Sequence, residues 1–521
     1  MGEDKPKAKP RSIRHRLSLA ALIMTASVLL SRILGYVRDA VVAARHGATS
    51  QTDVYFASFT LPDLMSYMLA GGALSITFLP LFSSYLHRGK EAEGWACFSV
   101  VATTVGSALA ILLAIAWILA PTLIPPLLPG FTADQIAQTV SLTRIVIPAQ
   151  MFFYVGGLLG ATVMARERFA EAALAPLVYN ACIIAGGLLL GPSLGIAGFS
   201  WGALIGAALG PFGLMYKAAR SRGLTYSPRF SLTDPDMRRF VRLSLPVMVG
   251  FSLVSVDEWI SRYYASSMAD GSISWIQNGR RLMLVPVSVL GQAAGQATLP
   301  FLSRLAAEGK PKEAASVLTD AVRVVLFATL AASAWMGVTS EPVVGLFYER
   351  GAFTTADTVA SAAALVFFSI GISFWALQAL MARGFYALQD TWTPMLIASG
   401  VAAAVLPIYW ILGDSMGHRG LALATTVGMT INAVLTTIAL RRKLPISFGV
   451  LGRSFARSAL IASFGGAAGF FALQTVATQG YFIRGAVGSA AFGLAFAIAA
   501  TALKAPEWTM LTSRIIGRFR R

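Results

Sequence analysis

The sequence predicts an all-α polytopic membrane protein of about fourteen transmembrane helices: two parallel six-helix lobes followed by two C-terminal helices. Three observations predict this class. Of the 521 residues 56% are hydrophobic and only 13% charged, where a soluble protein would carry about twice that charge. The mean hydropathy is +0.67, and the apolar residues come in blocks long enough to cross a roughly 30 Å hydrocarbon core as helices. The two halves also repeat each other.

The apolar blocks define the expected spans in order. Alternation of apolar and polar residues, which transmembrane strands require, is absent. The spans of the first lobe are 17–46, 54–86, 95–120, 136–165, 172–190 and 195–219. Those of the second lobe are 240–268, 272–307, 314–340, 358–387, 393–412 and 421–440, and the appended pair is 455–477 and 486–503.

An internal repeat relates the two lobes. The stretch TFLPLFSSYLHRGKEAE around Pro80 matches ATLPFLSRLAAEGKPKE around Pro300 without gaps, and the sequence MAR recurs at Met164 and Met381. Because each repeat holds an even number of spans, both copies sit the same way up in the membrane. This parallel duplication predicts two lobes that rock around a site near the bilayer midplane, with duplication without transport as the alternative.

Basic residues predict the orientation, because short cytoplasmic loops are enriched in Lys and Arg. Almost all of them fall on one side, which then holds both termini, whereas the other side carries few, such as Arg350, Arg419 and Arg484. Topology and anionic headgroups then account for the net charge of +18, and nucleic acid is not an expected partner. The predicted parts are a basic cytoplasmic tail 1–16, an N-lobe 17–220, a cytoplasmic connection 221–239, a C-lobe 240–441, the helices 455–504 and a basic cytoplasmic tail 505–521.

The first span carries charges at membrane depth. Arg32 lies fifteen residues into it, roughly 22 Å along a helix. An arginine at the bilayer centre costs roughly 2.5 to 3.5 kcal/mol, so we expect Arg32 to face a polar cavity. Asp39 shares its helical face, with Gly35 between them, and Arg38 lies near the far end of the span. The alternatives are a structural pair of Arg32 with Asp39, or snorkelling by Arg38.

The eighth span supplies a second set of charges. Arg281 lies ten residues after Gly271, roughly 15 Å along a helix, and Arg280 is rotated from it by about 100°. One of the two would then pair with an acidic residue of the preceding span. Asp257 and Glu258 are those residues, and one of them could instead carry a proton or a cation, or neutralise Arg262 one turn later.

Asp53 stands at the start of the second span. Its position there is typical of a residue that caps its own helix, with a gating role as the alternative.

Arginines converging from two lobes would suit an anion, and their fork geometry fits phosphate oxygens, a diphosphate best of all. A lipid tail on the substrate would explain a cavity open sideways. No catalytic residue, metal ligand or cofactor is expected, because His15, His46, His87 and His418 all fall at the ends of spans or in a tail. The drive would be the membrane potential or a coupling ion.

The run SRILGYVRDAVVAARHGATSQTDVYFASFTLPDLMSYMLAGGALSITFLPLF resembles the opening of the MurJ/MviN lipid II flippases, within the multidrug, oligosaccharidyl-lipid and polysaccharide exporter superfamily. The likeness continues through GATVMARERFAEAALAPLVYN, SISWIQNGRRLMLVPVSVLG, LFYERGAFTTAD and ARGFYALQDTWTP. It implies fourteen helices, and flipping of undecaprenyl-diphosphate-linked disaccharide pentapeptide across the bacterial inner membrane for peptidoglycan synthesis.

Site residues and partners follow from this resemblance. The family's first-helix arginines fall on Arg32 and Arg38, its aspartate on Asp53, and its cavity arginine on Arg281. The implied partners are the lipid-linked substrate, membrane lipids and, among proteins, those of cell-wall synthesis.

The sequence also departs from the family. Ser66, Tyr67 and Gly71 stand where the second helix usually carries an arginine and a glutamate, and Leu284 replaces a frequent acidic residue. The residues that some members use for sodium have no clear match. The departures leave a flippase for another polyprenyl-diphosphate-linked glycan as the main alternative. A transport-dead scaffold and a cation-coupled drug antiporter are further ones, although an antiporter for cations would carry cavity carboxylates rather than arginines.

Overall fold

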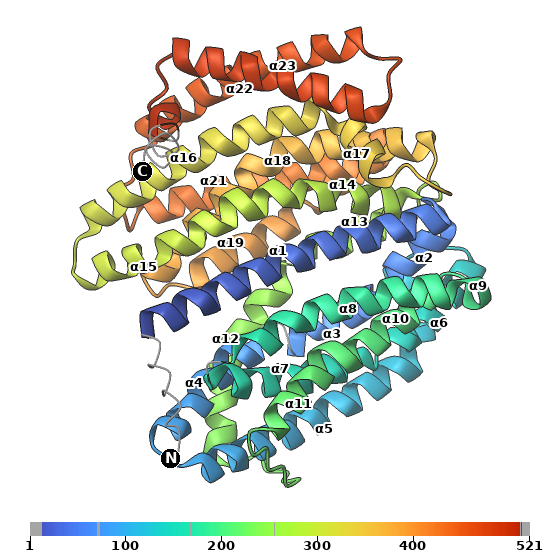
Figure 1. The fold of residues 1–521 in the computed structure, drawn as a ribbon, viewed down its shortest axis with the longest axis vertical. Coiled ribbons are helices and arrows are strands. Elements are labelled where there is room, and N and C mark those ends of the chain that lie inside the picture. Colours follow the sequence, from blue (N-terminus) through green and yellow to red (C-terminus); the bar gives the residue numbers. More distant parts are fainter. Residues whose placement is uncertain (1–12, 70–72, 167, 255, 511, 513–521) are drawn as a thin grey trace, which may run out of the picture. The chain divides into compact units, whose positions relative to one another are not determined.

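The computed structural model of this chain describes residues 13–69, 73–166, 168–254, 256–510 and 512 (Figure 1). In that part of the chain the regular structure is helical throughout, and strands do not occur. The predicted all-α class is therefore confirmed. Two compact units make up the chain. Unit 1 consists of Met1–Val42, Ser58–Ile124 and Ile136–Ser252, and unit 2 of Ala43–Ala57, Pro125–Gln135 and Leu253–Arg521.

Unit 1 is built from the helices of the first half of the chain. Its helices are α1 (Ile13–His46, which continues into unit 2), α3 (Thr60–Leu69), α4 (Ala73–His87), α5 (Glu91–Leu123), α6 (Ala133–Val146, which begins in unit 2), α7 (Ala149–Ala165), α8 (Phe169–Leu189), α9 (Gly191–Leu194), α10 (Ala197–Ala207), α11 (Met215–Arg220) and α12 (Pro235–Val254). A π-helical segment, Ala208–Leu214, joins α10 to α11. Buried aromatic residues such as Phe78, Phe82 and Phe98 contribute to the hydrophobic core of unit 1.

Unit 2 holds the second half of the chain and two segments of the first. Its helices are α2 (Ser50–Ser58), α13 (Val256–Ala265), α14 (Ser272–Pro286), α15 (Ala293–Ala307), α16 (Pro311–Val338), α17 (Ser340–Tyr348), α18 (Thr355–Ala387), α19 (Trp392–Ala404), α20 (Leu406–Met416), α21 (His418–Arg441), α22 (Phe448–Thr475) and α23 (Tyr481–Ala502). A further π-helical segment, Val287–Gln292, links α14 to α15. One core joins α16, α18 and α21 through residues such as Leu318, Leu380 and Leu440, and a second joins α16 to α22 and α23.

Most of the expected spans correspond to long apolar helices. Ten helical runs in the described residues are long and apolar enough to cross a membrane, and α19 with α20, bent by 43°, adds an eleventh. The three remaining expected spans, 17–46, 54–86 and 240–268, coincide with α1, with α2 to α4 and with α12 to α13. These elements are compatible with fourteen spans.

The span 54–86 is not the single helix that its hydropathy suggests. It is divided into α2, α3 and α4, and the first break lies at Phe59. Pro62 explains this break, because proline has no N–H to donate to the carbonyl four residues earlier and its ring crowds that carbonyl. The carbonyl belongs to Ser58, and Thr143 Oγ1 of α6 donates to it instead at 3.0 Å.

Proline accompanies other irregular points of the long helices. Pro148 lies between α6 and α7, and Pro407 follows the bend between α19 and α20. Both π-helical segments also involve a proline, since one contains Pro211 and the other follows Pro286. A lost N–H and a ring that crowds the preceding turn are the usual causes of such breaks.

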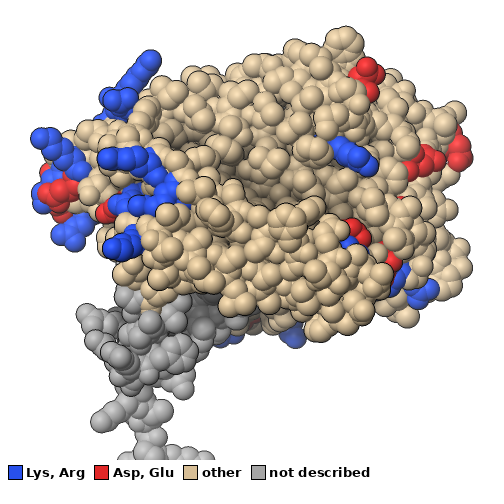
Figure 2. Space-filling view, turned by 90° about the horizontal axis from the view of Figure 1, so that it is seen from above, with Lys and Arg blue, Asp and Glu red and all other residues tan. Residues whose placement is uncertain are grey.

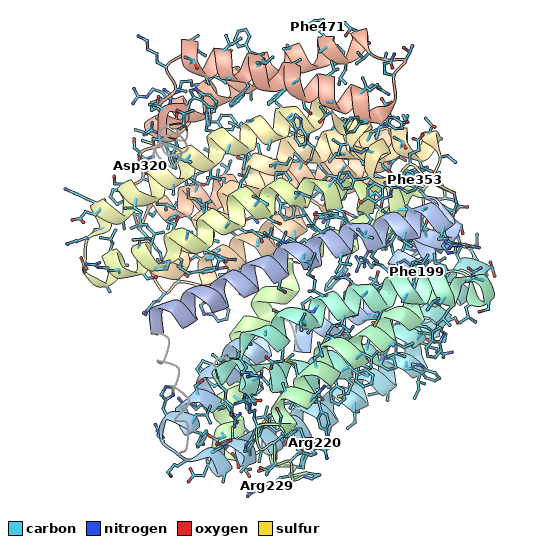
Figure 3. All side chains as sticks on the ribbon, in the orientation of Figure 1. Phe199, Arg220, Arg229, Asp320, Phe353 and Phe471 are labelled. Carbon is cyan, nitrogen blue, oxygen red and sulfur yellow. The ribbon has the colours of Figure 1, made fainter. Side chains whose placement is uncertain are left out.

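Within each unit, charged residues concentrate toward the helix ends. In unit 1, Arg220 and Arg229 lie at one end and Phe199 toward the other (Figure 3). In unit 2, Asp320 and Phe353 mark opposite ends, and Phe471 projects outward from α22 (Figure 3). The middle of the face formed by α22 and α23 carries few charged residues (Figure 2). Most of the Lys, Arg, Asp and Glu side chains visible on this face lie toward its two ends. This distribution suits helices that contact lipid along their middle.

Candidate functional site

Arg32 lies on α1 in unit 1 with its side chain exposed. Apolar side chains exposed on the same helix, among them Leu29, Ile33 and Val37, surround it. Within the described residues the side chain of Arg32 has neither an ion pair nor a hydrogen bond. A guanidinium in such surroundings is expensive to hold in lipid, and a bound anion would lower that cost.

Arg38 is held by two neighbours in unit 1. Its Nε and Nη2 lie 2.9 and 2.8 Å from Oδ1 of Asp39, and its Nη1 donates to Oδ1 of Asn180 on α8 at 3.2 Å. The carboxylate of Asp39 is buried. Asp39 is therefore paired with Arg38, not with Arg32 as the structural alternative from the sequence had it. Arg38 is oriented by this pair and is only 15% exposed.

Gly35 does not break α1. The helix runs without interruption from Ile13 to His46, and a Cβ placed on Gly35 would have no neighbour within 4 Å. The glycine is thus not required by packing in this conformation.

Asp53 caps α14, a helix more than two hundred residues away in sequence. Its Oδ2 accepts from the backbone N–H of Gly271 at 2.7 Å, and its Oδ1 accepts from the N–H and the hydroxyl of Ser274 at 2.8 and 2.7 Å. Thr52 Oγ1 lies 2.9 Å from the same hydroxyl. The sequence-based expectation that Asp53 caps its own helix is wrong, because the carboxylate satisfies the free N–H groups at the start of α14.

Two segments of the first half of the chain are fixed to unit 2 near this cap. The N–H of Ala352 donates to the carbonyl of Ala44 at 2.8 Å. Gln135 Nε2 donates to Ser50 Oγ and to Asp270 Oδ1, both at 3.0 Å. The segments 43–57 and 125–135 thus belong to unit 2 through backbone and side-chain hydrogen bonds.

The body of α14 carries Arg280 and Arg281, six and five residues before Pro286. A hollow of about 220 Å³, counted with its open mouth, lies between α13 and α14. Its lining combines charged, polar and apolar residues: Glu258, Ser261, Arg262, Ala265, Ile273, Ile276, Gln277 and Arg280. Arg281 is half-buried, and its charge acts on Glu258.

The two acidic residues of α13 are each paired with an arginine. Asp257 Oδ2 lies 2.7 Å from Arg280 Nη1, and Glu258 Oε1 lies 2.5 Å from Arg262 Nη2. Both pairings were among the alternatives left open by the sequence. Arg281 follows Arg280 on α14 and brings a third guanidinium to this part of unit 2.

Several partner residues were not identified from the sequence. They are Asn180 beside Arg38, Thr52 and Ser274 at the α14 cap, and Tyr409 and Thr425, which lie beside Asp257. All are uncharged polar residues in apolar helices, which is the signal that could have drawn attention to them. The side chains of Ser66 and Tyr67, and Gly71 itself, lie outside the described residues. The convergence of Arg32, Arg38 and Arg281 on one ligand stays a prediction.

These arrangements favour anion binding over chemistry. Arg32 and Arg281 provide charge whose fork geometry suits phosphate oxygens. The acidic residues of α13 are occupied by arginines, and therefore they do not form a general acid and base pair.

Residues 42–491 match the family model "Lipid II flippase MurJ". A probable lipid II flippase MurJ of Rhizobium tropici is 29% identical over 80% of this chain and 79% of its own length. The lipid II flippase MurJ of Burkholderia cenocepacia is 26% identical over 81% of this chain and 84% of its own length.

Solved structures show the same fold. A lipid II flippase MurJ in an inward closed conformation superimposes with a TM-score of 0.77 at 22% identity, covering 92% of this chain and 99% of that one. An inward-facing multidrug resistance MATE family transporter of the MOP superfamily gives 0.67 at 13% identity, covering 81% and 96%. With a family match over most of its length and this fold, the chain belongs to the lipid II flippase MurJ family.

Proposed function

We propose that the chain is a lipid II flippase of the bacterial inner membrane. It moves undecaprenyl-diphosphate-linked disaccharide pentapeptide from the cytoplasmic to the periplasmic leaflet during peptidoglycan synthesis. The family match over residues 42–491 carries the proposal, because it runs through both units. As a member of a flippase family the chain is a transporter and not an enzyme, and that family gives no reason to expect a cofactor.

In this proposal Arg32, Arg38 and Arg281 bind the diphosphate. The exposure of Arg32 supports its part, and Arg281 adds a guanidinium next to Arg280 on α14. Arg38 is oriented by Asp39 and Asn180, and a guanidinium held in this way suits the charge-assisted hydrogen bonds of a phosphate. The three guanidinium groups would replace the water lost by the diphosphate when it leaves the cytoplasm.

The transport cycle follows alternating access between the lobes 17–220 and 240–441, with the helices of 455–504 as an appendage. Asp53 acts as a gate: its bonds to α14 favour the state in which the segment 43–57 is bound to unit 2, and they break as the cycle proceeds. Gly35 leaves α1 free to bend. Both termini are cytoplasmic, and cell-wall synthesis proteins are the partners that would supply and use the lipid.

Complementation tests the proposal. In cells depleted of their own lipid II flippase, the wild-type chain restores growth and Arg32→Ala and Arg281→Ala do not. Arg304→Ala is the control, since this arginine is exposed in the last turn of α15 and pairs with Glu308. Equal membrane levels of all variants are checked by immunoblot. Full rescue by both alanine variants would exclude the proposed binding residues.

A second substrate is favoured by one observation. Ser66, Tyr67 and Gly71 lack the charges that the resemblance leads one to expect in this region. A flippase for another polyprenyl-diphosphate-linked glycan would retain the diphosphate arginines and change the groups that contact sugar or peptide. Failure of a well-expressed wild type to rescue, together with transport of a different polyprenyl-diphosphate glycan in vesicles, would select this alternative.

A further inference from the structure

Oxygen atoms from three helices lie near one another in unit 2, at and beside the carboxylate of Asp257. The hydroxyl of Tyr409 on α20 donates to its Oδ1, and Thr425 Oγ1 on α21 lies 2.8 Å from that hydroxyl. Ser261, one turn after Asp257 on α13, adds another hydroxyl and is itself buried. A carboxylate with neutral oxygens is the ligand set that proteins use to hold hard cations.

A guanidinium already occupies this set. Arg280 enters from α14 and places Nη1 2.7 Å from Asp257 Oδ2. Its Nη2 donates to Ser261 Oγ at 3.3 Å and to Thr425 Oγ1 at 3.4 Å. The ring of Phe368 on α18 lies 5.5 Å from the guanidinium carbon, on the face that attracts cations. The side chain of Arg280 is 8% exposed. Its guanidinium therefore occupies the place beside the Asp257 carboxylate that a bound cation would take.

We propose that Arg280 is a tethered cation, which fills an oxygen site that would otherwise take a monovalent metal ion such as Na⁺. Arginine stays protonated at any physiological pH and cannot leave its helix. Asp257 therefore neither loads nor releases an ion during the cycle. The other acidic residue of α13 is no substitute, because Glu258 is paired with Arg262. The proposal rests on the proposed function only for the existence of a transport cycle, whose drive would then lie elsewhere.

Substitution of Arg280 should expose the site. Arg280→Met keeps much of the length and removes the charge, which leaves the Asp257 carboxylate with the oxygens of Ser261, Tyr409 and Thr425. This variant should bind Na⁺. Arg280→Lys retains a cation and should not, and Arg280→Met combined with Asp257→Asn lacks the anionic ligand and should not.

The experiment measures thermal unfolding of the purified full-length protein in NaCl, KCl, LiCl and choline chloride at equal ionic strength. We expect the wild type to unfold at the same temperature in Na⁺ and in choline. Arg280→Met should gain roughly 2 to 4 °C in saturating Na⁺ over choline. The lysine and double variants should show no gain.

Either of two results would overturn the proposal. One is an Na⁺-specific rise in the wild type that Asp257→Asn abolishes, and the other is a folded Arg280→Met that gains nothing. Should Arg280→Met not fold, binding of ²²Na⁺ to the wild type decides: binding that Asp257→Asn removes contradicts the proposal, and absence of binding supports it. None of these readings involves lipid II, so they remain valid whatever substrate complementation reveals.

Discussion

Arg32 and Arg280 are held in this protein in two different ways. Arg280 is buried and meets a carboxylate, two hydroxyls and an aromatic face. Arg32 is exposed among apolar side chains. Removing the partner of a buried charge costs roughly 3 to 5 kcal/mol, whereas an exposed arginine can be removed with little structural effect. Loss of function after Arg32→Ala would therefore report on the ligand, while loss after Arg280→Ala could come from misfolding.

Asp53→Asn is expected to destabilise the protein. The carboxylate accepts three hydrogen bonds at the start of α14, and an amide would turn one acceptor oxygen into an N–H₂ group facing donors. A buried donor or acceptor without a partner costs roughly 1 to 3 kcal/mol. Thermal unfolding of the purified variant should show a lower midpoint than the wild type.

Asp270→Asn is the matched control for this change. Asp270 lies just before α14 and is exposed, and its Oδ1 accepts a hydrogen bond from Gln135. We expect a shift within about 0.5 kcal/mol, as for most surface substitutions. Equal midpoints for the two variants would show that the cap on α14 contributes nothing.

The ionised carboxylate of Asp390 should stabilise the folded protein at neutral pH, and this stabilisation should be lost in acid. Partial burial pushes the pKa of this carboxyl upward, but hydrogen bonds from Lys443 and Thr393 outweigh it and hold the pKa at about 2, below the ordinary 3.8. Because the folded pKa is depressed, the interaction stabilises the protein above the ordinary pKa and is lost as the pH falls toward 2.

The midpoint difference between wild type and Asp390→Asn measures this contribution. It should be present at pH 7 and shrink between about pH 4 and pH 2. Asp414→Asn, which changes an exposed carboxylate of α20, controls for the loss of a charge. A difference that stays constant down to pH 2.5 would argue against the Lys443 pair.

At the scale of elements, glycine fixes the place where α1 meets the loop between α17 and α18. Gly351 has φ +62°, and a Cβ there would fall on the carbonyl oxygen of Ala44, the same oxygen that accepts from Ala352. Gly417 has φ +60° but open space beside it. Both glycines have a positive φ that other residues rarely adopt, but only at Gly351 would an added Cβ clash with a neighbouring atom.

Alanine at these two glycines separates the two effects. Gly417→Ala should cost about 1 to 2 kcal/mol from the left-handed conformation alone. Gly351→Ala should cost more, because the Ala44 carbonyl must also move and lose its hydrogen bond. The thermal midpoints of the two purified variants test which substitution costs more. Equal losses would mean that the segment 43–57 can shift to accommodate the new Cβ at no cost in free energy.

The positions of most helices could be predicted from apolar blocks, because each block must cover the hydrocarbon core. The break at Phe59 could also have been predicted, since Pro62 is visible in the sequence. The direction of each side chain about its helix axis could not, because it depends on the neighbouring helices. Thus the sequence offered Asp257 and Glu258 as partners for Arg280 or Arg281 but left the pairing open, and it assigned Asp53 to the wrong helix.

At the scale of the whole molecule, the distribution of basic loops predicts which ends face the cytoplasm. Cysteines introduced at Lys310 and Arg350, in a background without Cys97 and Cys182, report on the two sides. A membrane-impermeant maleimide should label Arg350→Cys in spheroplasts and label Lys310→Cys only after permeabilisation. The reverse pattern would invert the topology, and labelling of both without permeabilisation would contradict it.

The chain passes between its two units five times, at residues 42/43, 57/58, 124/125, 135/136 and 252/253. As a consequence, a gene fragment encoding 253–521 alone would lack Asp53, and the first N–H groups of α14 would have no acceptor. Fragments cut within the largely exposed stretch 221–234 should fold only when both are made in the same cell. Each unit thus needs segments from both halves of the chain. The half-chains should copurify when they are made together, and each should be degraded when it is made alone.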